Sequence, residues 1–220
     1  INVMTTINIY QLGLGPMDNF IYLICDNITK KTAVIDPAWD TDSIIQTMSQ
    51  HNLDFDKILL THGHNDHTNG LETLLNFKQV PTYISKQEIQ SLTPSIPQLN
   101  QTNHNDIIEL GDSQIKCFHT PGHTPGGQCF YVDNHLIAGD TLFIDGCGRC
   151  DFNYASPESM FDSIQFLKSL PKETIIYPGH DYGPSHTDTL GNQCKTNPYL
   201  TTNSKNEFLS RRMGPELYII

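Results

Sequence analysis

One seven-residue segment, 61–67, reads Thr-His-Gly-His-Asn-Asp-His and gathers four side chains that commonly bind metals: His62, His64, Asp66 and His67. A structural zinc site uses four ligands, usually thiolates, and closes the coordination shell around the ion. Histidine and aspartate ligands that leave a position for water are instead typical of a catalytic metal centre. The segment therefore favours a metal-dependent enzyme over a protein that uses metal only to fold.

Three more candidate ligands follow on glycine-flanked turns. His123 lies in Pro-Gly-His-Thr-Pro-Gly, Asp140 in Gly-Asp-Thr-Leu-Phe, and His180 in Tyr-Pro-Gly-His-Asp-Tyr. Five imidazoles and two carboxylates suffice to hold two metal ions and leave a position open for water. The remaining histidines lack such a context, and we expect surface positions or local hydrogen bonds for His51, His104, His119, His135 and His186.

The residues around the cluster indicate where it lies in the fold. The apolar run 57–61 before it is short and predicts a strand, whereas residues 68–77 after it carry leucines at helical spacing. The ligands are thus predicted on a strand-to-helix loop at the carboxyl end of a strand. Open α/β sheets build their sites at this edge.

The rest of the chain predicts two strand-rich halves with helices between some of the strands. Predicted strands cover 7–12, 20–25, 32–35, 83–84, 107–110, 114–119, 128–133, 135–138 and 174–177, and predicted helices cover 41–51, 86–92 and 156–169. Residues 93–105 are rich in proline and asparagine and are predicted as a surface excursion near the site. Because strands and helices do not simply alternate, the pattern favours an α/β fold of two packed sheets with helices on the outer faces over one doubly wound sheet.

Length, charge and cysteine content narrow the class of protein. The chain has 220 residues and a net charge of −11, which argues against nucleic acid or an anionic membrane surface as a bulk partner. No segment approaches the roughly 20 apolar residues that span a bilayer, and no secretion signal is evident. Six scattered cysteines do not form a disulfide framework, so we expect a reduced, cytoplasmic protein with buried, inert thiols, including Cys147 and Cys150.

At the ligand loops the chain resembles the metallo-β-lactamase superfamily, whose fold is an αββα sandwich. The resemblance extends from residues 33–37 to about residues 197–199. Segments 139–143 and 146–149 resemble the branch that contains glyoxalase II and the persulfide dioxygenases. This implies a single domain over residues 1–220, in which 183–220 form a short C-terminal extension.

The resemblance also implies how the ligands are shared. The first metal would be held by His62, His64 and His123, the second by Asp66, His67 and His180, and both by Asp140 as a bridge. A hydroxide bridging the two ions would attack the substrate, and Asp66 would also orient it. Mixed histidine and aspartate ligands suit zinc, iron and manganese, so the identity of the metals stays open.

Other residues are expected to support the ligands or to bind substrate. Asp36 follows a predicted strand and is expected to accept a hydrogen bond from a ligand histidine, with Thr61 and Thr141 in similar roles. By the resemblance, Arg149 would bind a carboxylate of a glutathione-like substrate, and Tyr182 would contact it. The alternatives are a surface ion pair for Arg149 and a packing role for Tyr182.

Three functions follow as hypotheses. The first is a hydrolase with two divalent ions (zinc, iron or manganese) that cleaves a thioester such as an acylglutathione. The second is a sulfur dioxygenase that oxidises glutathione persulfide with a single Fe(II). Its ligands would be His123, Asp140 and one residue of the histidine cluster, either His64 or a near neighbour of it. The third is a catalytically idle binding protein of the same fold. Glyoxalase II has a longer C-terminal region than this chain, and the sequence leaves the natural substrate and the oligomeric state open.

Overall fold

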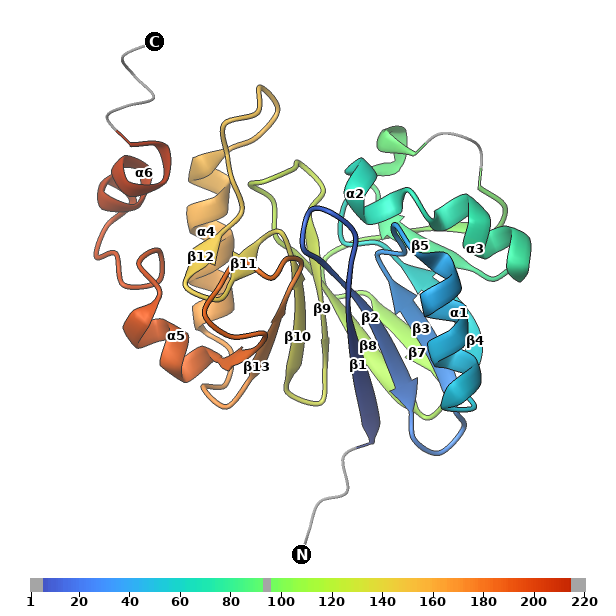
Figure 1. Ribbon diagram of the computed structural model, residues 1–220. Helices are drawn as coiled ribbons and strands as arrows, with labels where there is room; N and C mark the ends of the chain where they lie inside the picture. Colours follow the sequence, from blue (N-terminus) through green and yellow to red (C-terminus); the bar gives the residue numbers. More distant parts are fainter. Residues whose placement is uncertain (1–5, 93–95, 215–220) are drawn as a thin grey trace, which may run out of the picture.

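Two six-stranded sheets face each other at the centre of the molecule, and helices cover their outer faces (Figure 1). The computed structural model describes residues 6–92 and 96–214. The predicted domain covers residues 1–220, and its two ends, residues 1–5 and 215–220, lie outside the described part. Within it, the αββα sandwich expected from the sequence is confirmed.

The first sheet contains the strands of the amino-terminal half in chain order. They are β1 (Ile7–Leu14), β2 (Asn19–Asp26), β3 (Lys31–Ile35), β4 (Asp54–Leu59), β5 (Thr82–Ser85) and β6 (Leu99–Thr102). The first three strands run antiparallel, and β3 to β6 are parallel neighbours. The helical elements of this half are α1 (Thr41–Gln50), α2 (Asn65–Thr68), α3 (Leu71–Phe77) and the 3-10 helix η1 (Ile89–Ser91).

The second sheet has the order β14-β13-β10-β9-β8-β7. Its strands are β7 (Ile107–Leu110), β8 (Ser113–His119), β9 (Gln128–Val132), β10 (His135–Gly139), β13 (Ile175–Pro178) and β14 (Asp188–Thr189). A small pair, β11 (Leu142–Phe143) and β12 (Gly146–Cys147), stands apart from it. The helices of this half are α4 (Pro157–Lys168), α5 (Leu190–Thr196) and α6 (Lys205–Met213).

Three hydrophobic layers hold this arrangement together. The central layer joins both sheets, for example through Tyr22 of β2 and Phe130 of β9. One outer layer packs α1 and α3 on the first sheet, and the other packs α4 and α6 on the second. Because successive side chains of a strand point to opposite faces, the wholly buried β2 contributes to two layers: Phe20 and Tyr22 face the second sheet, whereas Ile21 faces the helices.

Local sequence signals set the helix beginnings. The side chain of Ser156 accepts a hydrogen bond from the backbone N–H of Ser159, and Pro157 occupies the first position of α4, as predicted. Met160, Ile164 and Leu167 then form its buried stripe. The helix is therefore anchored on the second sheet with its first turn close to the His123 loop, because Ser156 N–H donates to the Gly122 carbonyl.

Three predicted segments differ from the structure. The predicted helix 68–77 is two helices, α2 and α3, and Asp66 and His67 lie inside α2 rather than on a loop. The predicted helix 86–92 contains only the three residues of η1. Part of the predicted excursion 93–105 is strand β6, which pairs with β5, while residues 93–95 lie outside the described residues.

The C-terminal elements pack on the second sheet and α4. Leu190 of α5 and Phe208 of α6 belong to the same hydrophobic layer as Ile164 of α4, and the rings of Phe161 and Phe208 meet edge to face. All six cysteines are free, and five of them are buried, as the sequence predicts for inert thiols. Within residues 6–92 and 96–214, no helix has the length and apolar character to cross a membrane.

Candidate metal centre

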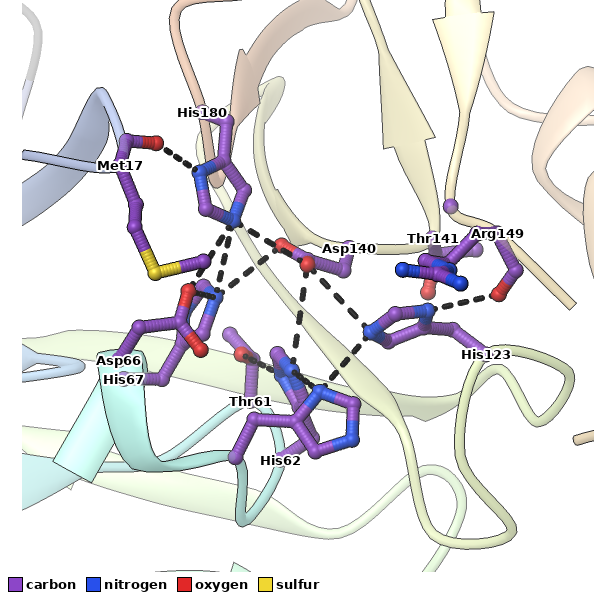
Figure 2. Close-up of polar contacts among 12 residues, drawn as sticks. Met17, Thr61, His62, Asp66, His67, His123, Asp140, Thr141, Arg149 and His180 are labelled. Carbon is purple, nitrogen blue, oxygen red and sulfur yellow. Dashed lines mark hydrogen bonds and ion pairs between the residues drawn. The ribbon is translucent and has the colours of Figure 1, made fainter. Parts of the chain in front are cut away.

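The seven predicted ligands meet at one end of the interface between the two sheets, although they come from both halves of the chain. Segment 61–67 follows β4 of the first sheet, and His123, Asp140 and His180 follow β8, β10 and β13 of the second. Figure 2 shows the side chains of the labelled histidines turned toward Asp140. The site is thus built by both sheets together.

The first group of ligands consists of His62, His64 and His123. His64 Nδ1 lies 3.1 Å from His62 Nε2 and 3.0 Å from His123 Nε2, so three ring nitrogens converge on one point. The outer nitrogens have other partners: His123 Nδ1 lies 2.8 Å from the Arg149 carbonyl, and His64 Nε2 lies 2.7 Å from the Tyr154 hydroxyl. A carbonyl only accepts, so the proton of a neutral His123 is on Nδ1 and its inward Nε2 carries a lone pair.

The same reasoning fixes the inward nitrogen of His62. Thr61 Oγ1 donates its single proton to Asp36 Oδ2 at 2.6 Å. It therefore accepts from His62 Nδ1, which lies 3.0 Å away. The inward Nε2 of a neutral His62 is consequently a lone pair as well.

Asp66, His67 and His180 form the second group. His67 Nε2 lies 3.3 Å from both Asp66 Oδ2 and His180 Nε2, and His180 Nε2 lies 3.4 Å from Asp66 Oδ2. The outer nitrogens are again held: His67 Nδ1 lies 2.9 Å from Asp36 Oδ2, and His180 Nδ1 lies 2.8 Å from the Met17 carbonyl. The hydrogen bond expected between Asp36 and one of the candidate ligand histidines is therefore present.

Asp140 lies between the two groups. Its Oδ2 is 3.4 Å from His123 Nε2 and 3.3 Å from His180 Nε2, while its Oδ1 is 3.3 Å from His67 Nε2. Oδ1 is buried and, among the described residues, has no hydrogen-bond partner besides this ion-pair contact with His67. A buried carboxylate oxygen without such a partner is costly unless a cation compensates its charge.

Together these contacts test whether metal ions fit the site. Inward lone pairs and carboxylate oxygens face one another at hydrogen-bonding distance, which is repulsive unless a cation lies between them. Asp36 is also close to His62 and His67, but its oxygens already accept from Thr61 and His67. The donor set therefore fits two divalent cations, one in each group, with Asp36 outside the ligand shell.

Burial and neighbouring charges shift the pKa values of the candidate ligand histidines in different directions. Burial lowers the pKa of His62 well below the ordinary value, and neighbouring histidines add to this effect. Burial also acts to lower the pKa of His67, but the carboxylates of Asp140, Asp36 and Asp66 outweigh it and raise that pKa well above the ordinary value. Without metal, a proton thus occupies the second group, whereas His62 stays neutral in the first.

This difference predicts that metal binding to the second group releases a proton at neutral pH. An ion must displace the proton of His67, so the apparent affinity of the second ion rises with pH, whereas that of the first changes less. Calorimetric titrations of metal-free protein in buffers of different ionisation enthalpy measure the released protons. Equal heats in all buffers for both binding steps would contradict the expectation.

Asn19 and Trp39 support Asp66 and were not predicted. Asn19 Nδ2 donates to Asp66 Oδ2 at 3.0 Å and to the Asp66 carbonyl at 3.1 Å. The indole N–H of Trp39 donates to Asn19 Oδ1 at 2.9 Å and fixes the orientation of that amide. Tyr154 and the carbonyl of Met17 were missed as well. No local motif marks any of these residues, because their role depends on contacts between distant parts of the chain.

Two glycines let the ligand turns approach one another. A Cβ at Gly148 would lie 1.8 Å from the Asp140 carbonyl oxygen, and a Cβ at Gly179 would lie 2.4 Å from Asp140 Oδ1. Gly179 N–H also donates to the Gly139 carbonyl at 2.9 Å, which joins the Asp140 and His180 turns. The glycine-rich turns are therefore a steric requirement of the site.

The predicted substrate contacts lie at the edge of the site. The Arg149 guanidinium, 57% exposed, donates through Nε and Nη2 to the carboxylate of Asp151 at 2.6 Å and lies over the ring of Phe152. Tyr182 stacks on the His180 ring with centroids 4.6 Å apart. The surface ion pair and the packing contact are thus both present.

The remaining sequence predictions concern two threonines, the cysteines and the outlying histidines, and not all of them are confirmed. Thr61 bonds a ligand histidine as expected, but the expectation for Thr141 is wrong because its hydroxyl pairs with Thr120 at 2.9 Å. Burial raises the pKa of the Cys150 thiol to about 12, which makes this thiol unreactive. The outlying histidines make local contacts, for example His119 with the Pro125 carbonyl, and His186 is exposed beside Asp181.

Comparisons with known proteins agree with this geometry. A family model described as the metallo-beta-lactamase superfamily matches residues 14–180. The probable polyketide biosynthesis zinc-dependent hydrolase PksB of Bacillus subtilis (strain 168) is 33% identical over 195 residues, covering 88% of this chain and 87% of that protein. A hydroxyacylglutathione hydrolase of Tolumonas auensis is 36% identical over 168 residues, covering 75% of this chain and 62% of that protein.

Solved structures show the same fold. ETHE1 from Myxococcus xanthus superposes with a TM-score of 0.84 at 27% identity, covering 96% of this chain and 94% of that one. TTHA1623 in a di-iron-bound form superposes with a TM-score of 0.76 at 29% identity, covering 87% of this chain and 100% of that one. The zinc-dependent relative and the di-iron neighbour both indicate divalent metals at a site of this kind.

Proposed function

The chain belongs to the metallo-β-lactamase superfamily, and from that premise we propose that it is a two-metal hydrolase that cleaves thioesters such as acylglutathiones. The single observation that carries the proposal is the double ligand group, with Asp140 between His123 and His180. A mononuclear enzyme needs only one of these groups. Both are complete here, and each has its outer nitrogens held by the protein.

The ligand assignment is part of the proposal. The first ion would be held by His62, His64 and His123, the second by Asp66, His67 and His180, and Asp140 would contact both. When bound, two such ions polarise a carbonyl oxygen and lower the pKa of water toward neutrality. The name of the PksB relative supports zinc, and the di-iron form of TTHA1623 supports a pair of ions.

Asp66 is proposed to orient the attacking water as well as to bind metal. Burial acts to raise the pKa of Asp66, but the hydrogen bond and charge of His67 and the amide of Asn19 lower it below the ordinary value. The carboxylate is therefore ionised at neutral pH and accepts hydrogen bonds, while Asn19 fixes its position. The thiolate that leaves from a thioester is a weak base, so the reaction requires no separate general acid.

A cavity beside the first ligand group offers space for the substrate. It has a volume of about 360 Å³ and is lined in part by His64, Gln87, Thr124 and Tyr154. Volumes of this order are typical of small-molecule sites. The names of the hydroxyacylglutathione hydrolase relatives support a glutathione conjugate, although this chain spans only 62% of the Tolumonas auensis enzyme.

The test combines metal analysis with two thioesters that carry the same acyl group on glutathione and on the neutral thiol N-acetylcysteamine. About two ions per chain and hydrolysis of at least one thioester are expected from protein purified without added metal or chelator. Metal-loaded protein that cleaves neither thioester would overturn the proposal and favour an idle binding protein. A single iron with oxygen uptake on glutathione persulfide would favour the dioxygenase.

Arg149→Ala tests the proposed contact with a substrate carboxylate. Loss of one charge-assisted hydrogen bond is worth about 1.5 kcal/mol, so kcat/KM for the acylglutathione is expected to fall about tenfold. The N-acetylcysteamine thioester lacks a carboxylate and serves as the matched control, with an unchanged kcat/KM. An equal fall for both substrates would assign Arg149 a structural role through Asp151 and Phe152. Tyr182 is proposed to line the same edge.

A further inference from the structure

Glu88 is a buried carboxylate that none of the functions above uses. It lies on the turn between β5 and η1, on the first-sheet side of the molecule, and is only 3% exposed. Glutamate is rarely buried to this extent unless its charge is compensated. The partners of this side chain therefore indicate what it does.

Its two carboxylate oxygens bind two different ligand loops. Oε2 accepts the backbone N–H of Gly63 at 3.0 Å, and Oε1 accepts the backbone N–H of Gly126 at 2.8 Å. Gly63 lies between His62 and His64, and Gly126 follows His123 by three residues. Ser91 Oγ adds a third hydrogen bond to Oε2 at 3.2 Å. Glu88 thus connects the loop of the first sheet to the loop of the second, at the first ligand group.

The packing around these hydrogen bonds also indicates that Glu88 connects the two loops. A Cβ at Gly126 would lie 2.5 Å from Glu88 Cγ, and a Cβ at Gly63 would lie 2.3 Å from Ser91 Cβ. Both loops therefore approach the segment from Glu88 to Ser91 so closely that a side chain on either glycine would collide with it. The segment from Glu88 to Ser91 is therefore in tight contact with both loops.

We propose that Glu88 is a positioning residue for the first metal: its carboxylate sets the distance between the His62–His64 loop and the His123 loop. This inference rests on the proposed function in so far as that function places an ion among these three histidines. Outer-shell partners of this kind orient metal ligands, and their loss typically weakens metal binding about 10- to 100-fold.

The chemistry of the contact requires a carboxylate rather than an amide. Each of the two backbone N–H groups donates to a different oxygen of the carboxylate, so both oxygens are needed as acceptors. Glutamine has nearly the same shape but only one oxygen, so its NH₂ group would face one of the two N–H donors. Glu88→Gln therefore breaks one of the two loop contacts without leaving a hole.

The experiment compares Glu88→Gln with Glu72→Gln, which removes the same charge from an exposed position of α3. Each protein is titrated with Zn²⁺ against a chelator to obtain two stepwise dissociation constants, and with Co²⁺ to record the absorption spectrum of the bound ion. In Glu88→Gln we expect about 10- to 100-fold weaker binding at the first group and an altered Co²⁺ spectrum. The constant of the second group and both constants of Glu72→Gln are expected to match the parent.

The outcomes separate the positioning role from general stability and from the proposed function. Unchanged constants and an unchanged Co²⁺ spectrum in Glu88→Gln would overturn the inference, as would an equal loss at both groups. If Glu88→Gln does not fold, Glu88→Asp decides: it keeps the charge but is too short to reach both loops, and it should show the same selective loss. A parent protein that binds two ions but cleaves no thioester would refute the proposed function and leave this comparison valid.

Discussion

Replacing His180 by alanine is expected to remove the second metal ion and to lower thioester hydrolysis about a thousandfold. His180 belongs only to the second ligand group, where its Nε2 faces Asp66 and Asp140. Without it, that group retains Asp66 and His67, too few ligands to hold an ion firmly beside a shared Asp140. The loss of one ion removes about 4 kcal/mol of stabilisation of the charge that develops in the transition state. This energy corresponds to the thousandfold fall in the rate of hydrolysis.

The measurement pairs metal content with kcat for His180→Ala, His67→Ala and the control His186→Ala. His186 lies six residues from His180, but its side chain is exposed and, among the acidic residues that the structure describes, it pairs with Asp181. The control is expected to keep two ions and the parent rate. If His180→Ala hydrolysed thioesters at the parent rate, the two-metal mechanism would be wrong. Retained oxygen uptake on a persulfide would instead fit a single iron near His123 and Asp140.

The second large effect is expected from Asp36→Asn, although Asp36 binds no metal in the assignment above. One carboxylate accepts from the Thr61 N–H, from the Thr61 hydroxyl and from His67 Nδ1. It thereby orients His67 directly and His62 through Thr61, one ligand in each group. An amide offers one acceptor oxygen, so at least one of these bonds is lost, and metal affinity is expected to fall about 10- to 100-fold.

The backbone conformation of residue 36 is compatible with asparagine. Asp36 has a φ of 54°, a left-handed conformation that asparagine tolerates better than most residues. The substitution therefore changes the side chain without new backbone strain. Chelator competition measures the affinity of both ions, and Asp42→Asn on the exposed side of α1 is the matched control. Parent affinity in Asp36→Asn would show that the ligand histidines hold their orientation without this carboxylate.

Much of the fold was predictable because its signals are local. The continuous apolar run of β2, the leucine spacing in α3 and the Ser-Pro start of α4 each act within a few residues. Strand β6 was missed because Leu99–Thr102 has little strand character of its own and forms by parallel pairing with β5. The segment 86–92 was predicted helical, but Glu88 lies on the turn before η1, where its side chain bonds two loops, and the backbone is already extended at Leu92, so only three residues are helical.

The site divides in the same way. The seven candidate ligands could be predicted because metal binding restricts residue type, and because five of them, all except Asp66 and His67, stand next to a glycine. The groups that hydrogen-bond to these ligands could not be predicted. Asn19 meets Asp66 across 47 positions, and Tyr154 meets His64 across 90. The carbonyl of Met17 meets His180 across 163. A backbone carbonyl or a lone amide has no sequence signature, so only the packed chain shows these contacts.

The division of the ligands between the two sheets has a consequence for folding. Each assigned ion would bind residues from both halves, as His62 with His123 and His67 with His180 show. Ions that bind only the assembled sandwich stabilise it by mass action, by about 2.7 kcal/mol per ion at a free concentration 100 times the dissociation constant. The folded fraction of newly made chains would then follow the supply of metal in the cell. Metal shortage would reduce the amount of enzyme as well as its activity.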